Sequence, residues 1–114
     1  MHDSACIFCK IAAQAVPAKE VYRDDDVVAV VDVTPQAPHH LLVMPVAHHP
    51  NVSSFVEAVD ADAVAKLFRV AARIGAEYTR GFRLVVNEGQ QGGQTVQHLH
   101  VHVLAGRHME WPPG

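Results

Sequence analysis

Apolar residues in the first half of the chain occur in short runs that are bounded by turn residues. In chain order these runs are Val21-Tyr22, residues 27–31 and residues 40–44. Aspartates at 24–26 separate the first two, and two prolines within residues 34–38 separate the last two. Because turn residues and prolines interrupt strands, this pattern predicts three short strands, of which the second and third form a hairpin.

The spacing of apolar residues is helical in two other segments. Residues 4–14 predict a short helix, with Ser4 as its N-cap and Pro17 beyond its end. A longer helix is predicted from Asp60 to about Gly81, because apolar residues recur there every three or four positions. Its apolar face consists of Val64, Leu67, Phe68, Ala71, Ile74, Gly75 and Tyr78.

The last third of the chain predicts two more strands around a glycine-rich loop. Residues 82–86 and 96–104 have the composition of strands, and residues 87–95 between them form the loop. The expected order is helix, three strands, helix and two strands. This order predicts an α+β fold with an antiparallel meander, and residues 1–114 correspond to a single domain.

The composition limits the classes of protein to which the chain can belong. Hydrophobic residues make up 49% and charged residues 18%, which is typical of a globular protein and too apolar for a disordered one. No apolar run approaches the roughly 20 residues that cross a bilayer, and the N-terminus does not resemble a signal peptide. The net charge of −3 argues against a nucleic-acid-binding protein. We expect a cytoplasmic protein with reduced thiols.

Histidine is the most informative residue type, because eight of the nine histidines fall into two groups. One group comprises His39, His40, His48 and His49, and the other comprises His98, His100, His102 and His108. From residue 98 to residue 104, histidines alternate with apolar residues. On a strand this alternation would place the first three imidazoles of the second group on one face and the apolar side chains against the long helix. Three imidazoles on one face have no packing rationale and indicate chemistry.

The spacing of His98, His100 and His102 limits their use as metal ligands. Neighbours stand about 6.8 Å apart along a strand and the outer two about 13 Å, so at most two can share an ion. At least one is then free for catalysis. The preceding loop offers backbone N–H groups at Gly92 and Gly93 that can cradle an anion. Because no Lys or Arg occurs in either histidine-rich stretch, imidazoles and backbone dipoles would supply the counter-charge.

The pair Cys6-Ile-Phe-Cys9 is open to several interpretations. The expected compartment disfavours a disulfide, and a thioredoxin-like redox pair would follow a strand, whereas none precedes this one. The pair can instead supply half of a Cys₂His₂ zinc site, with two of the other histidines completing it. Two unligated buried thiols are the remaining alternative.

Several motifs, in the expected order, resemble the histidine triad (HIT) family of nucleotide hydrolases and transferases. Residues 98–104 match its His-φ-His-φ-His-φ-φ signature, and residues 32–40, Asn87-Glu-Gly and Gly92-Gly-Gln-Thr95 are similar to other family motifs. The resemblance extends from about Ile7 to the end of the chain. The tail from residue 106 onward resembles the Hint branch, the purine nucleoside phosphoramidases, more than the dinucleoside-polyphosphate branch. A HIT fold and a homodimer are therefore implied.

The resemblance also implies roles for individual residues. His100 would be the nucleophile that attacks the α-phosphorus of a nucleotide, and His102 would contact the phosphate. His40 and His98 would complete the set of catalytic histidines. The implied nucleotide-binding residues are Asp32 at the ribose, Val33 at the base, Asn87, Gly93, Gln94 and Thr95 at the phosphate or leaving group, and Trp111 from the partner subunit.

The cysteines acquire a role from the same resemblance. It implies a structural zinc held by Cys6, Cys9, His48 and His98, with His49 as a rival for His48, and it requires no catalytic metal. The implied activity is cleavage of the P–N bond of purine nucleoside 5′-phosphoramidates through a nucleotidyl-histidine intermediate, with release of AMP. A dinucleoside polyphosphate hydrolase and a zinc-stabilised nucleotide-binding module are the alternatives.

Overall fold

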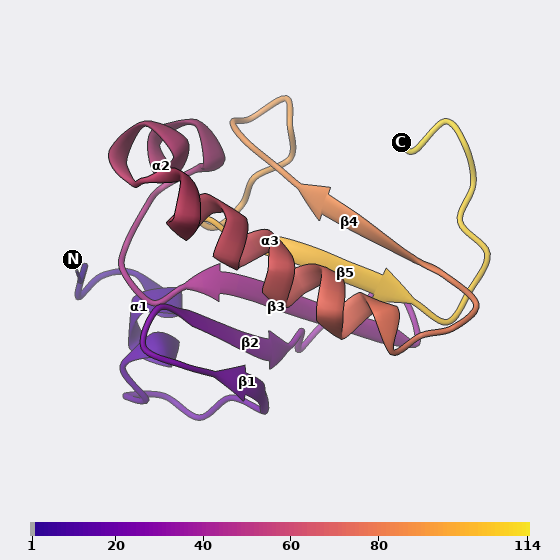
Figure 1. The fold of residues 1–114 in the computed structure, drawn as a ribbon, viewed down its shortest axis with the longest axis horizontal. Coiled ribbons are helices and arrows are strands. Elements are labelled where there is room, and N and C mark those ends of the chain that lie inside the picture. The colour runs from indigo at the N-terminus through magenta and orange to yellow at the C-terminus, as the bar shows by residue number, and fades with distance from the viewer. Residues whose placement is uncertain (1) are drawn as a thin grey trace.

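The computed structural model describes residues 2–114 and shows one antiparallel sheet of five strands (Figure 1). The strands are β1 (Glu20–Arg23), β2 (Val27–Val31), β3 (His39–Pro45), β4 (Phe82–Val86) and β5 (Val101–Ala105). Their order in the sheet is β1-β2-β3-β5-β4. The α+β fold class is confirmed.

The predicted simple meander is wrong at its last two strands. The first three strands are neighbours in chain order, and β2 pairs with β3 as the expected hairpin. The helical connection after β3 leads to a strand that is not adjacent to β3 in the sheet. β4 is therefore the edge strand, and β5 lies between β3 and β4 and pairs with both. A helical connection can join strands that are not adjacent in the sheet. The apolar pattern alone does not show that the position between β3 and β4 is left for a later strand.

Three helices flank the sheet: α1 (Ile7–Ala12), α2 (Val52–Ala58) and α3 (Ala61–Ala76). Asp60 caps α3 as predicted, since its carboxylate accepts a hydrogen bond from the Ala63 N–H. The cap of α1 is Cys6 rather than the predicted Ser4, and its sulfur accepts from the Cys9 N–H. Helix α2 was not predicted, because seven residues are too few for a periodic pattern.

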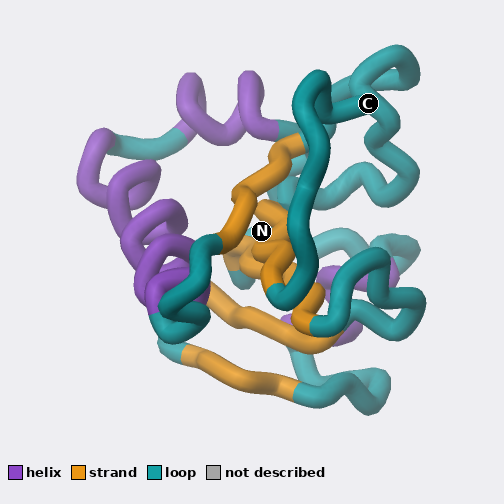
Figure 2. The backbone as a smooth tube through the Cα atoms, turned by 90° about the vertical axis from the view of Figure 1, so that its right-hand side faces the viewer, coloured by secondary structure: helices purple, strands orange, loops and turns teal. Residues whose placement is uncertain are grey.

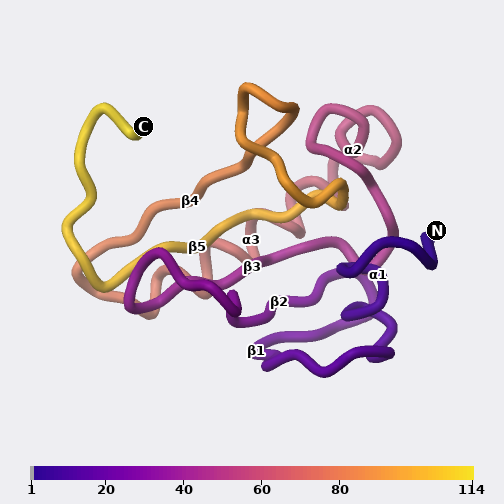
Figure 3. The backbone as a smooth tube through the Cα atoms, turned by 180° about the vertical axis from the view of Figure 1, so that it is seen from behind, coloured from indigo at the N-terminus to yellow at the C-terminus, as the bar shows by residue number. Residues whose placement is uncertain are grey.

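Two apolar layers cover opposite faces of the sheet. Alternate residues of β2 and β3, with Leu99, Val101 and Val103, pack against α2 and α3. The other residues of β2 and β3 pack against Phe8 and Ala12 of α1. Figure 2 shows the long helix on one side of the strands, and Figure 3, from behind, shows α1 beside β2 and β3. Both predicted helices therefore have a buried face, which stabilises elements too short to persist alone.

The last strand begins later than predicted. Residues 96–100 were expected in a strand, but β5 starts at Val101, so His98 and His100 precede it. The reason is that the Leu99 N–H donates to the carbonyl of His49, at 2.7 Å, instead of joining the sheet. No helix in the described part of the chain is long and apolar enough to cross a membrane.

Candidate catalytic and metal sites

The predicted alternation around the three histidines is present although part of it lies outside the strand. Leu99, Val101 and Val103 are buried against α3. The ring of Phe8, on the opposite face of the sheet, contacts the rings of His98 and His100 at centroid distances of 6.0 and 5.0 Å. The imidazole of His100 also lies edge-on to that of His102, at 4.9 Å. All three imidazoles therefore lie on the face that α1 covers.

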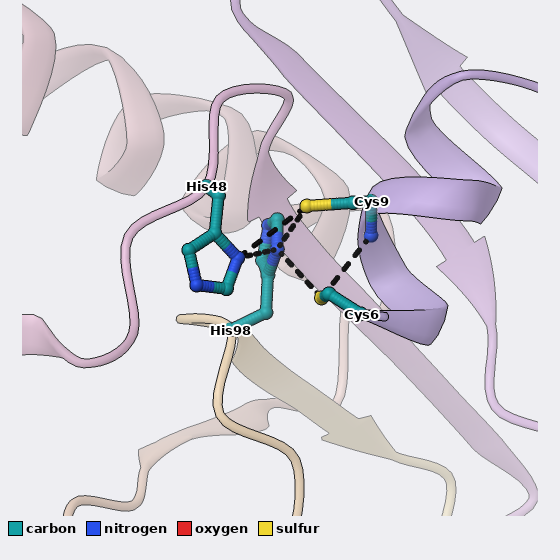
Figure 4. A group of neighbouring side chains, drawn as sticks. All are labelled: Cys6, Cys9, His48 and His98. Carbon is teal, nitrogen blue, oxygen red and sulfur yellow. Dashed lines mark hydrogen bonds between the residues drawn. The ribbon is translucent and has the colours of Figure 1, made fainter. Parts of the chain in front are cut away.

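A first cluster gathers two sulfurs and two imidazole nitrogens from three distant parts of the chain (Figure 4). α1 and its cap supply the cysteines, the loop after β3 supplies one histidine, and the segment before β5 supplies the other. The ligand atoms of Cys6, Cys9, His48 and His98 all lie within 4.8 Å of one another. Cys9 and His98 are fully buried, whereas Cys6 and His48 are partly exposed, so the cluster lies at the edge of the core.

The distances within this cluster fit a tetrahedral metal site. The two Nδ1 atoms of His48 and His98 are 3.3 Å apart, and the Cys9 sulfur is 3.4 and 3.5 Å from them. Ordinary zinc–nitrogen and zinc–sulfur bond lengths imply tetrahedral edges of roughly 3.3 to 3.8 Å. These three edges match those values, and Cys₂His₂ is a set of ligands that zinc prefers.

Hydrogen bonds around the cluster leave the right atoms free for a metal. The Nε2–H of His98 donates to the Pro45 carbonyl at 2.8 Å, so its Nδ1 keeps a lone pair that faces the sulfurs. Backbone N–H groups of Asp3 and Cys9 donate to the sulfurs of Cys9 and Cys6. Burial raises the pKa of the Cys9 thiol in the metal-free chain, so metal binding must displace its proton.

His49, the rival ligand, points elsewhere. Its ring packs edge-on against Phe55 at 5.0 Å, and its carbonyl accepts from the Leu99 N–H. Of the two adjacent histidines, His48 therefore belongs to the metal cluster. The predicted structural zinc site of Cys6, Cys9, His48 and His98 is confirmed, and a disulfide or a redox pair is not needed to explain the cysteines.

A second cluster joins His40, His102 and Asp32. The Nε2 of His40 lies 2.8 Å from Nδ1 of His102 and 3.4 Å from a carboxylate oxygen of Asp32. The Gln36 N–H donates to Nδ1 of His40, so the proton of a neutral His40 is on Nε2 and is shared with His102. A neutral His102 accepts at Nδ1 and therefore carries its own proton on Nε2.

Burial keeps this pair of imidazoles uncharged at neutral pH. Burial, with smaller contributions from neighbouring His100 and His40, lowers the pKa of His102 to about 4, and Asp32 opposes the shift. Burial also lowers the pKa of His40, where Asp32 again opposes and His100 assists. In two neutral rings the hydrogen bond has its one donor, Nε2–H of His40, and its one acceptor, Nδ1 of His102.

His100 lies beside this pair, but its proton is on Nδ1, whereas those of His40 and His102 are on Nε2. Its Nδ1–H donates to the carbonyl of His98 at 2.8 Å. The other ring nitrogen, Nε2, therefore holds a free lone pair at the tip of the side chain. An imidazole held in this tautomer is a competent nucleophile.

The glycine-rich loop is held by the side chains of two of its own residues. Gln94 is buried, and its amide donates to the carbonyls of Pro50 and Val96 and accepts from the Gly89 N–H. The side-chain amide of Asn87 donates to the Gly92 carbonyl. Because its amide connects Gly89 to Pro50 and Val96, Gln94 braces the loop against the segments beside it. Gly93, at φ +80°, and exposed Thr95 remain available to a ligand.

Of the other expected nucleotide contacts, Val33 and Trp111 are exposed and Asp32 is partly buried. Val33 is 93% exposed and Trp111 81% exposed, so no part of the described chain covers them. One carboxylate oxygen of Asp32 accepts from the N–H and hydroxyl of Thr34, while the other faces His40. Sequence reasoning missed the backbone partners Pro45, Gln36 and His49, and a carbonyl or N–H leaves no mark on residue type that could have revealed them.

Comparison with known proteins assigns the family. A family model described as the HIT domain matches residues 13–109. The chain belongs to the HIT family. This HIT protein is 40% identical over 115 residues to the adenylylsulfatase HINT1 of Arabidopsis thaliana, and the match covers 98% of this chain and 78% of that protein.

Two further relatives cover nearly the whole HIT chain. A 14 kDa zinc-binding protein of Brassica juncea is 40% identical, over 95% of this chain and 98% of its own. The crystal structure of a HIT family hydrolase from Legionella pneumophila has a TM-score of 0.90 and 40% identity, and it covers 96% of this chain and 99% of its own. The expected HIT fold is confirmed, and the chain is a HIT family hydrolase.

Proposed function

We propose that this hydrolase cleaves the P–N bond of purine nucleoside 5′-phosphoramidates and releases AMP through a nucleotidyl intermediate on His100. The observation that carries the proposal is the hydrogen bond from Nδ1–H of His100 to the carbonyl of His98. Because this bond occupies Nδ1, a neutral His100 carries its lone pair on Nε2, so it can attack without a separate general base to remove a proton from that nitrogen.

The neighbouring imidazoles supply protons at the reacting phosphate. In the first step Nε2 of His100 bonds to the α-phosphorus as the bond to the amine breaks. His102 carries its proton on Nε2 and can donate it to a phosphate oxygen or to the leaving amine. The amine leaves with the proton from His102; water then attacks the phosphorus and gives up a proton to Nε2 of His102, the bond to His100 breaks, and the nucleoside monophosphate leaves. Splitting one displacement into two is the usual advantage of a covalent intermediate.

The remaining contacts are assigned by position. Asp32 would bind the ribose through the oxygen that faces His40, and Val33 would lie at the base. The backbone of Gly93, with Thr95 and Asn87, would bind the phosphate or leaving group, with Gln94 bracing their loop. No Lys or Arg occurs between residues 84 and 106. Backbone dipoles and imidazoles therefore carry the counter-charge.

The names of the relatives agree with a nucleotidyl substrate. The Arabidopsis relative is named an adenylylsulfatase, an enzyme that acts on an adenylyl group joined to a leaving group. The relative from Brassica is named a zinc-binding protein. In this chain zinc would cross-link α1 to the sheet, and the displacement chemistry would belong to the histidines.

A second copy of the chain would complete the site. β4 is the edge of the sheet and pairs with β5 alone, so its outer backbone groups are open to another strand. Phe82, at one end of this strand, is 39% exposed. A homodimer that extends the sheet across β4 would cover this edge and could bring Trp111 of one protomer to the leaving-group side of the other.

The proposal is tested with a fluorogenic adenosine phosphoramidate. The wild-type protein should release the amine, and His100→Asn should not, while His108→Asn, a change to an exposed histidine, should retain the wild-type rate. Equal rates in wild type and His100→Asn would exclude the covalent mechanism. Faster turnover of a diadenosine polyphosphate than of the phosphoramidate would assign the other branch, and binding of AMP without turnover of either would indicate a binding module.

A further inference from the structure

The segment that carries the nucleophile is not held by the sheet. β5 begins at Val101, so the backbone of residues 98–100 lies outside the ladder that fixes His102 between β3 and β4. The only backbone hydrogen bond from this segment to another part of the described chain is that of the Leu99 N–H to His49. A nucleophile needs its position fixed to within a fraction of an ångström, so another constraint is required.

His98 supplies that constraint, because three of its polar groups are engaged at once. Its Nδ1 faces the sulfurs of the metal cluster, at 3.3 Å from Cys6 and 3.5 Å from Cys9. Its Nε2–H donates to the carbonyl of Pro45 at the end of β3. Its own carbonyl accepts the Nδ1–H of His100. One residue therefore connects the metal cluster to the tautomer of the nucleophile.

The Cys-x-x-Cys segment makes a second connection to the same imidazole. Phe8 lies between the two cysteines in sequence and is 8% exposed. Its ring meets that of His100 edge-on, with the centroids 5.0 Å apart and the planes at 89°. The anchored residue His48 is also adjacent to His49, whose carbonyl holds the Leu99 N–H. Cys9 and His48, two ligands of the cluster, are therefore next in sequence to Phe8 and His49. Both of these neighbours contact the 98–100 segment.

We infer that the metal cluster is a positioning device for catalysis, which holds the ring of His100 in its Nδ1–H tautomer through the carbonyl of His98 and through Phe8. The inference rests on the proposed function for its effect on rate. Cys6, Cys9 and Phe8 are positioning residues in this scheme, because the cysteines act through His98 and Phe8 acts on the ring of His100. A metal that served only to stabilise the fold would leave the nucleophile unchanged in any form of the protein that stays folded.

The test compares the zinc-loaded wild-type protein with Cys9→Ser, under conditions in which circular dichroism shows both to be folded. We expect the variant to lose zinc by elemental analysis and its kcat for the phosphoramidate to fall on the order of tenfold. KM should change by no more than about twofold, because the residues proposed to bind the nucleotide are untouched. Leu67→Ala serves as the control for stability. It should create a cavity in the apolar layer between α3 and the sheet and leave kcat unchanged.

A second readout does not involve the reaction. The ¹⁵N shifts of the His100 ring, assigned by their absence in His100→Asn, report which nitrogen carries the proton. The wild-type ring should show the Nδ1–H form, and Cys9→Ser should show a mixture that includes the Nε2–H form. If His100→Asn stays active, the proposed function fails while this readout still tests the inference.

One result would overturn the inference: a folded, zinc-free Cys9→Ser protein with wild-type kcat and unchanged His100 shifts. Should Cys9→Ser be unfolded, Phe8→Leu decides the matter, because it keeps all four metal ligands and removes the ring that abuts His100. It should retain zinc and lower kcat severalfold, with broadened His100 signals. Unchanged kcat and signals in Phe8→Leu would then count against the inference.

Discussion

His98 and His100 are two residues apart and use their ring nitrogens in opposite ways. Each donates one N–H to a backbone carbonyl, but His98 does so through Nε2 and His100 through Nδ1. His98 is left with a lone pair on the nitrogen near the backbone, which suits a metal enclosed by the fold. His100 is left with a lone pair at the tip of the ring, which can reach a substrate. The two residues are both histidines, and the ring nitrogen that binds a backbone carbonyl determines which of them can be a metal ligand and which a nucleophile.

The two clusters also differ in whether a proton lies between their nitrogens. In the metal cluster the two Nδ1 atoms are 3.3 Å apart, and His98 has already placed its proton on Nε2. In the catalytic cluster His40 and His102 share a proton across 2.8 Å. In the first arrangement the lone pair of His98 Nδ1 faces two sulfurs, which suits a bound cation, whereas in the second the shared proton already satisfies both rings.

The largest effect should come from His100→Asn, which breaks one half of this comparison. We expect a fall in kcat/KM of about a thousandfold or more, because the covalent route is lost. Zinc content and Tm should stay close to those of the wild type, since His100 is not a metal ligand. The measurement is a steady-state assay with elemental analysis and a thermal melt, and loss of zinc in this variant would show that the two clusters are not separable.

His98→Asn should disrupt the metal site. It removes a metal ligand that is fully buried, so the protein should lose zinc and its Tm should fall by on the order of 10 °C or more. A chelator added to the wild-type protein should give a similar fall, reversed by added zinc. A melt that does not respond to the chelator would contradict a structural role for the metal.

His40→Asn and His39→Gln form a matched pair on opposite faces of β3. His40 contacts His102, Asp32 and the Gln36 N–H, so its loss should lower kcat about tenfold to a hundredfold. The ring of His39 stacks on Tyr78, with the centroids 4.5 Å apart, and His39→Gln should leave kcat unchanged. Equal rates in the two variants would remove His40 from the catalytic cluster.

Acid should weaken the fold through the buried catalytic imidazole. The pKa of His102 is about 4 in the folded chain and near 6.5 when unfolded, so between these values the unfolded chain binds more protons. The contribution to stability is therefore complete above about pH 6.5 and is lost as the pH falls toward 4. Urea midpoints at several pH values should decline less steeply in His102→Asn than in the wild type, and parallel curves would contradict the assignment.

The smallest effect is expected away from both clusters. Lys66 bridges Asp24 and Asp26 on the surface, at 3.1 and 2.7 Å. Exposed ion pairs contribute little, so Lys66→Met should change Tm by no more than about 3 °C and leave kcat unchanged. A larger shift in a thermal melt would mean that this pair couples β1 and β2 to α3 more strongly than its exposure suggests.

Local patterns in the sequence predicted much of this structure. Asp60 as a cap, the apolar face of α3 and the alternation around Leu99, Val101 and Val103 follow from the period of the chain alone. The metal set came from the resemblance to the HIT family, and the cluster contains all four of its residues. These features depend on residues close in sequence or on a recognisable motif.

The features that were missed depend on contacts between distant residues. The position of β5 between β3 and β4 depends on how the helical connection between β3 and β4 places β4 in the sheet. The late start of β5 depends on the hydrogen bond from the Leu99 N–H to the His49 carbonyl. Helix α2 has a readable signal in the Asn51 cap, whose oxygen accepts from the Ser54 N–H, but only one fully buried side chain, Phe55. A single buried residue gives no period to detect.

The order of the strands has a consequence for biosynthesis. Because the last strand to leave the ribosome is inserted between two that precede it, the nascent sheet has a gap until residue 105 has emerged. Pairings between distant segments form late in such topologies. A chain that ended between β4 and residue 98 would leave the facing edges of β3 and β4 unpaired and would lack His98, His100 and His102, so we expect such a fragment to be inactive and prone to aggregate.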